Sequence, residues 1–180
     1  MARTTTTIII ISLSTFLLSV SSHPSPYEAL QQYNFPVGLL PKGATGYSLS
    51  RATGEFTAYL NGSCSFALEN SSYQLKYKPV IKGVISRGRL QKLSGVSVKV
   101  LVLWLDIVEV KRNDEDLEFS VGITSANFPV SNFEECPQCG CGLDCGSGDR
   151  NRSAVVPSAD SPPPAVLELE ILGKLEALKM

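Results

Sequence analysis

The middle of the chain alternates apolar and polar residues with the two-residue period of a half-buried β-strand. The runs that show this pattern are residues 56–60, 64–68, 73–78, 80–89, 107–110 and 117–123. They are short and closely spaced, with little helical pattern between them. Such a succession predicts one mainly β domain, a compact antiparallel β-barrel or sandwich.

Two segments inside this region carry more specific signals. Asn61 and Gly62 stand between two alternating runs, and this pair is a strong hairpin signal because both residues tolerate positive φ. Residues 96–105 (VSVKVLVLWL) begin as an alternating strand and become continuously apolar. That change predicts a central strand that is covered on both faces at its far end.

A short helix is predicted immediately before the β region. Ser25, Pro26 and Glu28 occupy the N-cap, first and third positions of a capping box. The helix should continue to about Tyr33, because Phe35 precedes a proline and is thereby disfavoured in the α region. The β domain with this helix is expected to span residues 23–141.

The chain after this domain changes in composition. Residues 142–164 are dense in Gly, Ser, Asp and Pro, which predicts a disordered linker. Residues 165–180 place apolar side chains on one face of a candidate amphipathic helix. An isolated helix of this length is only marginally stable, so it is expected to form on docking. The linker and helix together form a flexible tail.

The first residues have the pattern of a secretory signal peptide. Arg3 supplies the positive charge, residues 8–20 form the apolar run, and Val20 and Ser22 are small residues before a cleavage site at His23. A membrane span needs about 20 apolar residues, and this run is shorter and interrupted by Ser and Thr. Residues 1–22 are therefore predicted to be removed, leaving an extracellular chain without a transmembrane anchor.

Three N-glycosylation sequons agree with that destination. They begin at Asn61, Asn70 and Asn151. Each sequon alone is a weak signal because the pattern is short. Downstream of a signal peptide, the three together predict a secreted glycoprotein.

The cysteines are unevenly distributed. Cys136, Cys139, Cys141 and Cys145 crowd one short segment, whereas Cys64 stands alone on a predicted strand. Disulfides are the default in a secretory compartment. Cys64 is expected to join one member of the cluster and close a loop of roughly 75 residues, which stabilises the fold by about 4 kcal/mol in the chain-entropy treatment.

Other arrangements of the cysteines stay open at this point. A local bridge within the cluster, a four-thiolate zinc site and a redox Cys-x-x-Cys pair at Cys136 and Cys139 are alternatives. Five cysteines cannot all pair within one chain, so the odd one could also link two chains.

Composition narrows the function classes. A hydrophobic content of 43% is sufficient for a core, and 16 basic against 17 acidic residues give no basic footprint for nucleic acid. His23 is the only histidine, and it falls at the fraying start of the mature chain, which disfavours histidine-dependent catalysis and zinc sites. We expect no cofactor, no metal and no nucleic-acid partner.

Carboxylates remain as candidate catalytic groups for a hydrolase. A carboxylate-dependent hydrolase would need two acids placed several ångström apart. The acids available near the predicted strands are Asp106, Glu118, Glu134 and Glu135. Acids at strand ends are ordinarily solvated or paired, so the sequence leans towards a protein that is not an enzyme.

An ordered series of motifs resembles a known plant family, domain-of-unknown-function family 538. The motifs are residues 36–41 (PVGLLP), 83–86 (GVIS), 93–96 (LSGV) with Trp104, 119–122 (FSVG), 128–130 (FPV) and 133–136 (FEEC). The resemblance covers about residues 27–141. It implies a plant source, a compact β fold with an N-terminal helix and frequent secretion, here to the apoplast. A distant similarity of this family to bactericidal/permeability-increasing lipid-binding proteins has been suggested, but it supplies no catalytic residues.

The leading functional expectation is a secreted, non-enzymatic module that binds a lipid or another apolar small ligand. Its candidate cavity residues are Leu101, Leu103, Trp104 and Phe119, because small closed β structures hold such ligands in their interior. The alternative for these residues is that they simply fill the core. The alternative for the protein is a cell-wall or apoplast partner-binding protein that acts through its surface and tail.

Overall fold

The computed structural model describes residues 24–67, 73–100 and 102–143. The elements are α1 (Pro26–Gln32), η1 (Val37–Leu39), β1 (Ala44–Leu49), β2 (Glu55–Leu60), β3 (Cys64–Ala67), β4 (Gln74–Ser86), β5 (Arg89–Val100), β6 (Leu103–Asp106), β7 (Glu109–Asn113), β8 (Asp116–Ser120), β9 (Ser125–Pro129) and η2 (Val130–Phe133). The predicted signal peptide and C-terminal helix lie outside the described residues. So does the linker, apart from its first two positions.

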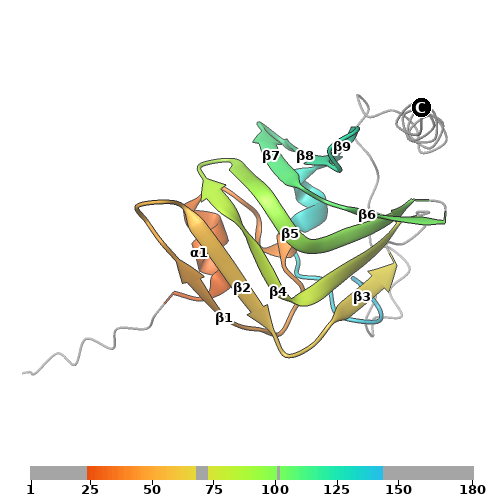
Figure 1. Cartoon of the computed structure of the whole chain (residues 1–180), viewed down its shortest axis with the longest axis horizontal. Coiled ribbons are helices and arrows are strands. Elements are labelled where there is room, and N and C mark those ends of the chain that lie inside the picture. The colour runs from red at the N-terminus through yellow and green to blue at the C-terminus, as the bar shows by residue number, and fades with distance from the viewer. Residues whose placement is uncertain (1–23, 68–72, 101, 144–180) are drawn as a thin grey trace, which may run out of the picture.

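The nine strands of the described residues form one antiparallel sheet. Seven of them follow the order β1-β2-β4-β5-β7-β8-β9, and β3 and β6 lie beside this path, paired with β4 and β5 respectively. The long strands β4 and β5 pair with each other, and each also pairs with two shorter strands. Along its length β4 pairs first with β3 and then with β2, and β5 pairs first with β7 and then with β6. The sheet is open, because β1 and β9 are its two ends and do not pair with each other. The predicted mainly β fold with a short N-terminal helix is confirmed (Figure 1).

The two long strands curve where their ladder is interrupted. Pairing between β4 and β5 shifts register between Tyr77 and Lys82, a stretch that includes Pro79. On the facing strand, Gly95 has a φ of +91°, and a Cβ there would collide with the carbonyl oxygen of Val80. A proline without an N–H and a glycine with positive φ together bend the pair, as Figure 1 shows.

The core lies on the inner face of this curved sheet. The helices α1 and η2 pack against that face and lie behind the sheet in Figure 1. The predicted capping box is present: Glu28 N–H donates to Ser25 Oγ and Ser25 N–H donates to the Glu28 carboxylate. Ala29 and Leu30 of α1 are buried against the sheet. The largest fully buried side chains include Phe35, Leu117 and Val110.

The hairpin predicted at Asn61 and Gly62 is not formed. β2 and β3 both run antiparallel to β4 and pair with successive parts of it, so the chain bends between them without reversing. Neither Asn61 nor Gly62 has a positive φ. The alternating pattern predicted two strands over residues 73–89, but β4 is a single strand of 13 residues. Its length allows both β2 and β3 to pair along the same edge.

The apolar segment 96–105 also differs from its prediction. β5 ends at Val100 and β6 begins at Leu103, with Val100 paired to Leu103 and Lys99 to Trp104. The segment is a hairpin and not one central strand, and its outward side chains are exposed to solvent. Within the described residues, no helix has both the length and the apolar character that crossing a membrane requires.

Candidate functional site

A small cavity lies against the inner face of the sheet, among the described residues. Its volume is about 40 Å³, and its apolar lining includes Leu40, Tyr77, Val96 and Phe119. Sites for small organic ligands usually measure about 300–1,000 Å³. This cavity, which is lined by described residues, is therefore too small for such a ligand.

Of the four residues predicted to line a ligand cavity, the three that the structure describes do not line a common one. Phe119 lines the 40 Å³ cavity, whereas Leu103 faces inward without lining it. Trp104 points the other way and is 47% exposed, because successive residues of a strand face opposite sides. Leu101 lies outside the described residues.

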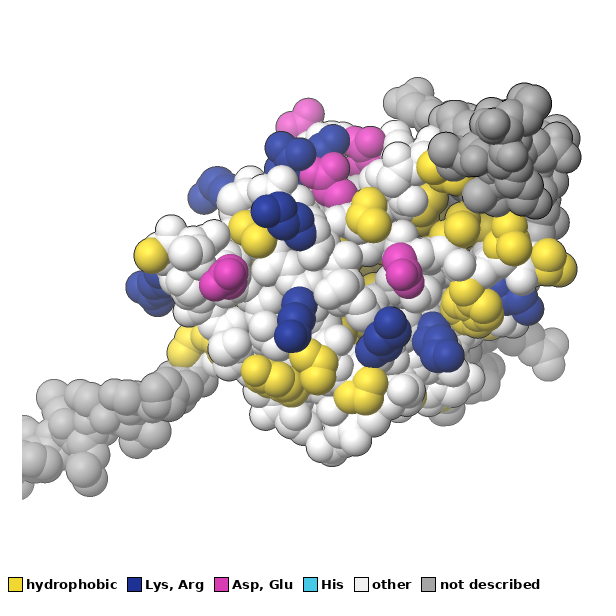
Figure 2. All heavy atoms as spheres, in the orientation of Figure 1, with side chains coloured by type: hydrophobic (Ala, Val, Ile, Leu, Met, Phe, Trp, Pro, Cys, Tyr) yellow, Lys and Arg dark blue, Asp and Glu magenta, His cyan; other side chains and the backbone are white. Residues whose placement is uncertain are grey.

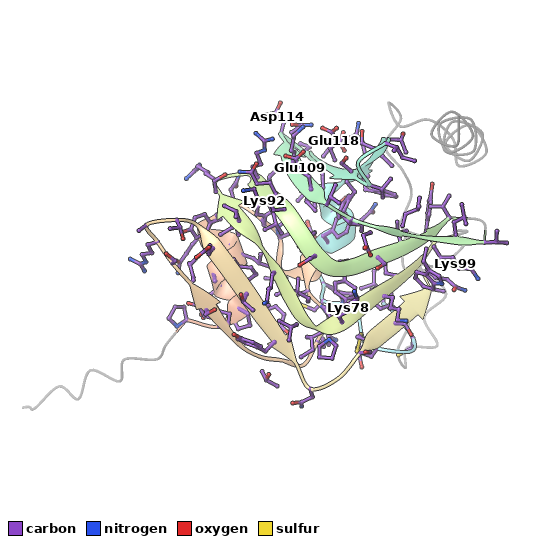
Figure 3. All side chains as sticks on the ribbon, viewed as in Figure 1. Lys78, Lys92, Lys99, Glu109, Asp114 and Glu118 are labelled. Atoms are coloured by element: carbon purple, nitrogen blue, oxygen red, sulfur yellow. A yellow bond between two sulfur atoms is a disulfide. The ribbon has the colours of Figure 1, made fainter. Side chains whose placement is uncertain are left out.

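The solvent-facing side of β2, β4, β5 and β6, here called the outer face, carries four exposed lysines and the half-buried Lys99. These are Lys76, Lys78, Lys82, Lys92 and Lys99, against the acids Glu55 and Asp106. Figure 2 shows basic side chains spread over this face, and Figure 3 shows Lys78, Lys92 and Lys99 along β4 and β5. Among the described residues, none of these five lysines forms an ion pair.

One end of the outer face is apolar as well as basic. Val102 is 83% exposed at the β5–β6 turn, and Trp104 follows it on β6. The Lys76 ammonium lies 5.9 Å from the centroid of the Trp104 ring, and Lys99 is the cross-strand partner of Trp104. We call Val102, Trp104, Lys76 and Lys99 the hairpin tip. Its chemistry combines exposed hydrocarbon with positive charge.

The other end of the outer face has an open groove that is lined by both polar and apolar residues. Its volume is about 570 Å³, and the residues that line it are Ser48, Leu49, Ser50, Glu55, Phe56, Thr57, Lys82, Gly83, Val84 and Lys92. These residues come from β1, β2, β4 and β5. Hydroxyl groups, two ammonium groups and one carboxylate therefore converge on one open space.

The four acids considered for a hydrolase lie apart from these spaces. Asp106 accepts a hydrogen bond from Ser97 Oγ at 2.6 Å, and Glu118 accepts one from Asn113 Nδ2 at 3.2 Å. Glu134 and Glu135 are exposed after η2. None of the four lines the groove or the 40 Å³ cavity.

The predicted bridge between Cys64 and the cysteine cluster is present. Cys64 is bonded to Cys139, 75 residues away, and ties β3 to the segment after η2. Cys141 is disulfide-bonded as well. These bonds leave neither a Cys136–Cys139 redox pair nor four free thiolates for zinc. Cys145 lies outside the described residues.

Cys136 is the free thiol of the described part of the chain. Its Sγ donates to the carbonyl oxygen of Val37 at 3.4 Å. Burial raises the pKa of this thiol, and the positive charge of Lys42 opposes the shift only in part. The group is therefore protonated at neutral pH and is a poor nucleophile.

The predicted glycosylation sites are only partly within the described residues. Asn61 is exposed at the bend between β2 and β3. Asn70 and Asn151 lie outside the described residues. Glycosylation at the three sequons stays a prediction.

Two comparisons relate this fold to known proteins. The family described as "Protein of unknown function, DUF538" matches residues 26–134. An uncharacterized protein of Arabidopsis thaliana is 26% identical over 96 residues, which cover 53% of this chain and 55% of the Arabidopsis protein. The chain thus spans about half the length of that relative. Since the family match covers more than half of the chain, including every described strand, the protein belongs to the DUF538 family.

Proposed function

We propose that the protein is a secreted, non-enzymatic module that binds lipid, and that it does so at the hairpin tip and not in an enclosed cavity. The observation that carries the proposal is the exposure of Val102 and Trp104 beside Lys76 and Lys99. The 40 Å³ interior cavity is far too small for an acyl chain, which directs an apolar ligand to the surface.

The chemistry of the hairpin tip suits the boundary between lipid headgroups and acyl chains. Tryptophan is enriched at this boundary because its ring is apolar and its N–H is polar. Val102 would enter the hydrocarbon, and each lysine near an anionic lipid surface contributes about 1 kcal/mol of attraction. Together these groups favour an anionic bilayer over a neutral one.

Vesicle binding by the full chain tests this proposal. Trp104 is the only tryptophan, so its fluorescence reports directly on the hairpin tip. Vesicles of phosphatidylcholine mixed with phosphatidylserine should shift its emission to shorter wavelength and carry the protein into the pellet. Phosphatidylcholine alone should do so more weakly.

A pair of matched substitutions locates the contact. Val102→Ser should weaken vesicle binding at least tenfold, whereas Val80→Ser, at a 40% exposed position of the outer face away from the tip, should leave it unchanged. The proposal fails if neither vesicle binds or if the two variants behave alike. A stoichiometric apolar adduct in native mass spectrometry that survives Val102→Ser would point instead to an enclosed ligand.

Secretion is tested separately, by expression of the full chain in plant cells. The protein should reach the medium with residues 1–22 removed and lose mass on treatment with an N-glycosidase. Retention inside the cell with an intact N-terminus would contradict the secretory part of the proposal.

A further inference from the structure

The groove at the β1–β2 end of the outer face has a built arrangement of polar side chains. Ser48 pairs with Thr57 across β1 and β2, Thr57 with Lys82 across β2 and β4, and Lys82 with Ser94 across β4 and β5. Directly opposed side chains lie on the same face of a sheet. Thr57 and Ser94 therefore lie on either side of Lys82 on the outer face, and Thr57 lines the groove with it.

Lys92 reaches the same groove through an unusual backbone conformation. Its φ is +52°, a region that is unfavourable for a residue with a Cβ. The other two non-glycine residues with positive φ in the described part of the chain are Asn34 and Asp114, whose short polar side chains tolerate it. Lysine has no such local compensation, and strain of this kind often marks a functional position.

The strained residue changes which way the strand faces. Leu90 and Leu93 are both buried on the inner face although they are three residues apart, so the strand carries an extra residue between them. A bulge of this kind re-aims a side chain. Lys92, which strict alternation would turn into the core, is exposed and lines the groove.

The charge balance of the groove selects the ligand. Two lysines and Glu55 give a local net charge of +1, which attracts an anion and which one carboxylate neutralises. A doubly charged phosphate is attracted more strongly but costs more to remove from water, because that cost rises with the square of the charge. Thr53 Oγ1 donates to Glu55 Oε2 at 3.3 Å, and the remaining carboxylate oxygen can accept a hydrogen bond from a ligand hydroxyl. Ser48, Ser50 and Thr57 add hydroxyl partners, and about 570 Å³ lies within the range of small-ligand sites.

From this geometry we infer that the groove is a binding site for an acidic sugar, a hydroxyl-rich ring with one carboxylate. Lys82 and Lys92 bind the carboxylate, and the serine, threonine and Glu55 side chains bind the ring hydroxyls. The inference goes beyond lipid binding at the hairpin tip and shares no residue with it. Val102→Ser should therefore leave sugar binding intact.

The test uses three probes that differ in one group: D-glucuronate, D-glucose and D-glucose 6-phosphate. Titration of the full chain, followed by amide chemical shifts, should show saturable shifts around the groove with D-glucuronate. Binding of D-glucose should be at least tenfold weaker. The phosphate sugar should also bind more weakly than D-glucuronate.

Substitutions separate binding from folding. Lys92→Gly removes the ammonium and also relieves the backbone strain, because glycine adopts a positive φ freely. It should weaken D-glucuronate binding at least tenfold while the Tm stays the same or rises. Lys82→Met should weaken binding similarly, and Lys78→Met, an exposed outer-face lysine outside the groove, should not.

Several results would overturn the inference. One is D-glucuronate binding no tighter than D-glucose. Another is unchanged binding in Lys92→Gly, and a third is equal losses in Lys82→Met and Lys78→Met. Tighter binding of the phosphate sugar would replace the acidic sugar with a phosphate ligand.

Discussion

The two faces of the curved β4–β5 pair are built for different tasks. On β4, Tyr77, Ile81 and Ile85 turn inward and are at most 4% exposed. Lys78 and Lys82 lie beside them in the sequence, yet they turn outward to solvent. The inner side chains stabilise the fold by burial, whereas the outer ones add little to it and are free to meet a ligand.

The charges around β7 and β8 sharpen this contrast. Arg89 Nε lies 2.6 Å from Glu109 Oε1, Lys111 approaches the same carboxylate at 3.7 Å, and Arg112 donates to Asn34. Figure 3 shows Glu109, Asp114 and Glu118 gathered over this corner, away from Lys78 and Lys99. Charged groups that pair with one another in this way connect neighbouring elements of the fold. Lysines that lack such partners within the described residues are the better candidates for binding.

The largest effect on the inner side should come from the bridge between Cys64 and Cys139. Replacing both by Ala should lower the free energy of unfolding by about 4 kcal/mol, because the bridge closes a long loop in the unfolded chain. Urea unfolding measures the change. Ser65→Ala, on the exposed side of the same strand, is the control and should change stability by less than about 0.5 kcal/mol. A loss below about 1 kcal/mol in the double variant would contradict the expectation.

A neighbouring pair on β4 compares the two faces directly. Ile81→Ala should destabilise the fold by about 3 kcal/mol, since the side chain is 2% exposed and lines the interior cavity, which the substitution enlarges. Lys82→Ala should change stability by less than about 0.5 kcal/mol. Both values come from chemical denaturation under the same conditions. Equal losses would mean that the outer face also carries the fold.

A smaller effect should appear in alkaline solution. Burial strongly raises the pKa of Tyr77, whose hydroxyl donates to the Leu39 carbonyl oxygen at 3.3 Å. Above pH 10 the unfolded chain loses this proton while the folded chain keeps it, so stability falls as pH rises. The slope for one such group reaches about 1.4 kcal/mol per pH unit.

Tyr77→Phe isolates this contribution. The variant should lose about 1 kcal/mol at neutral pH with the hydrogen bond, and its stability should fall less steeply than that of the unchanged chain above pH 10. Urea unfolding at a series of pH values measures both effects. Parallel slopes for the two proteins would show that Tyr77 ionises equally in the folded and unfolded chains.

Local signals in the sequence predicted the elements that depend on local interactions. The capping box at Ser25 and the alternating strand that contains Phe56 need only neighbouring residues, and both are confirmed. The strand pairing around Asn61 and the hairpin within residues 96–105 depend on partners far away in the chain. Alternation alone could not supply those partners.

The candidate site was only partly visible in the sequence for the same reason. Alternation places Lys76 and Lys78 on the solvent side of β4, as observed. For Lys92, alternation predicts the buried side of the strand, whereas the side chain is exposed. The bulge at this position reverses which residues of β5 face inward. Neither the open groove nor the choice of Cys139 as the partner of Cys64 follows from spacing, since both depend on how the sheet curves.

The close contact between η1 and the segment after η2 has a consequence for sulfur chemistry. A Cβ at Gly38 would collide with the carbonyl oxygens of Phe133 and Glu135, so only glycine lets η1 settle there. This docking half-buries the Cys136 thiol beside two oxidised cysteines, and burial raises its pKa. Because a thiolate is the species that attacks a disulfide, the contact at Gly38 disfavours thiol–disulfide exchange by Cys136.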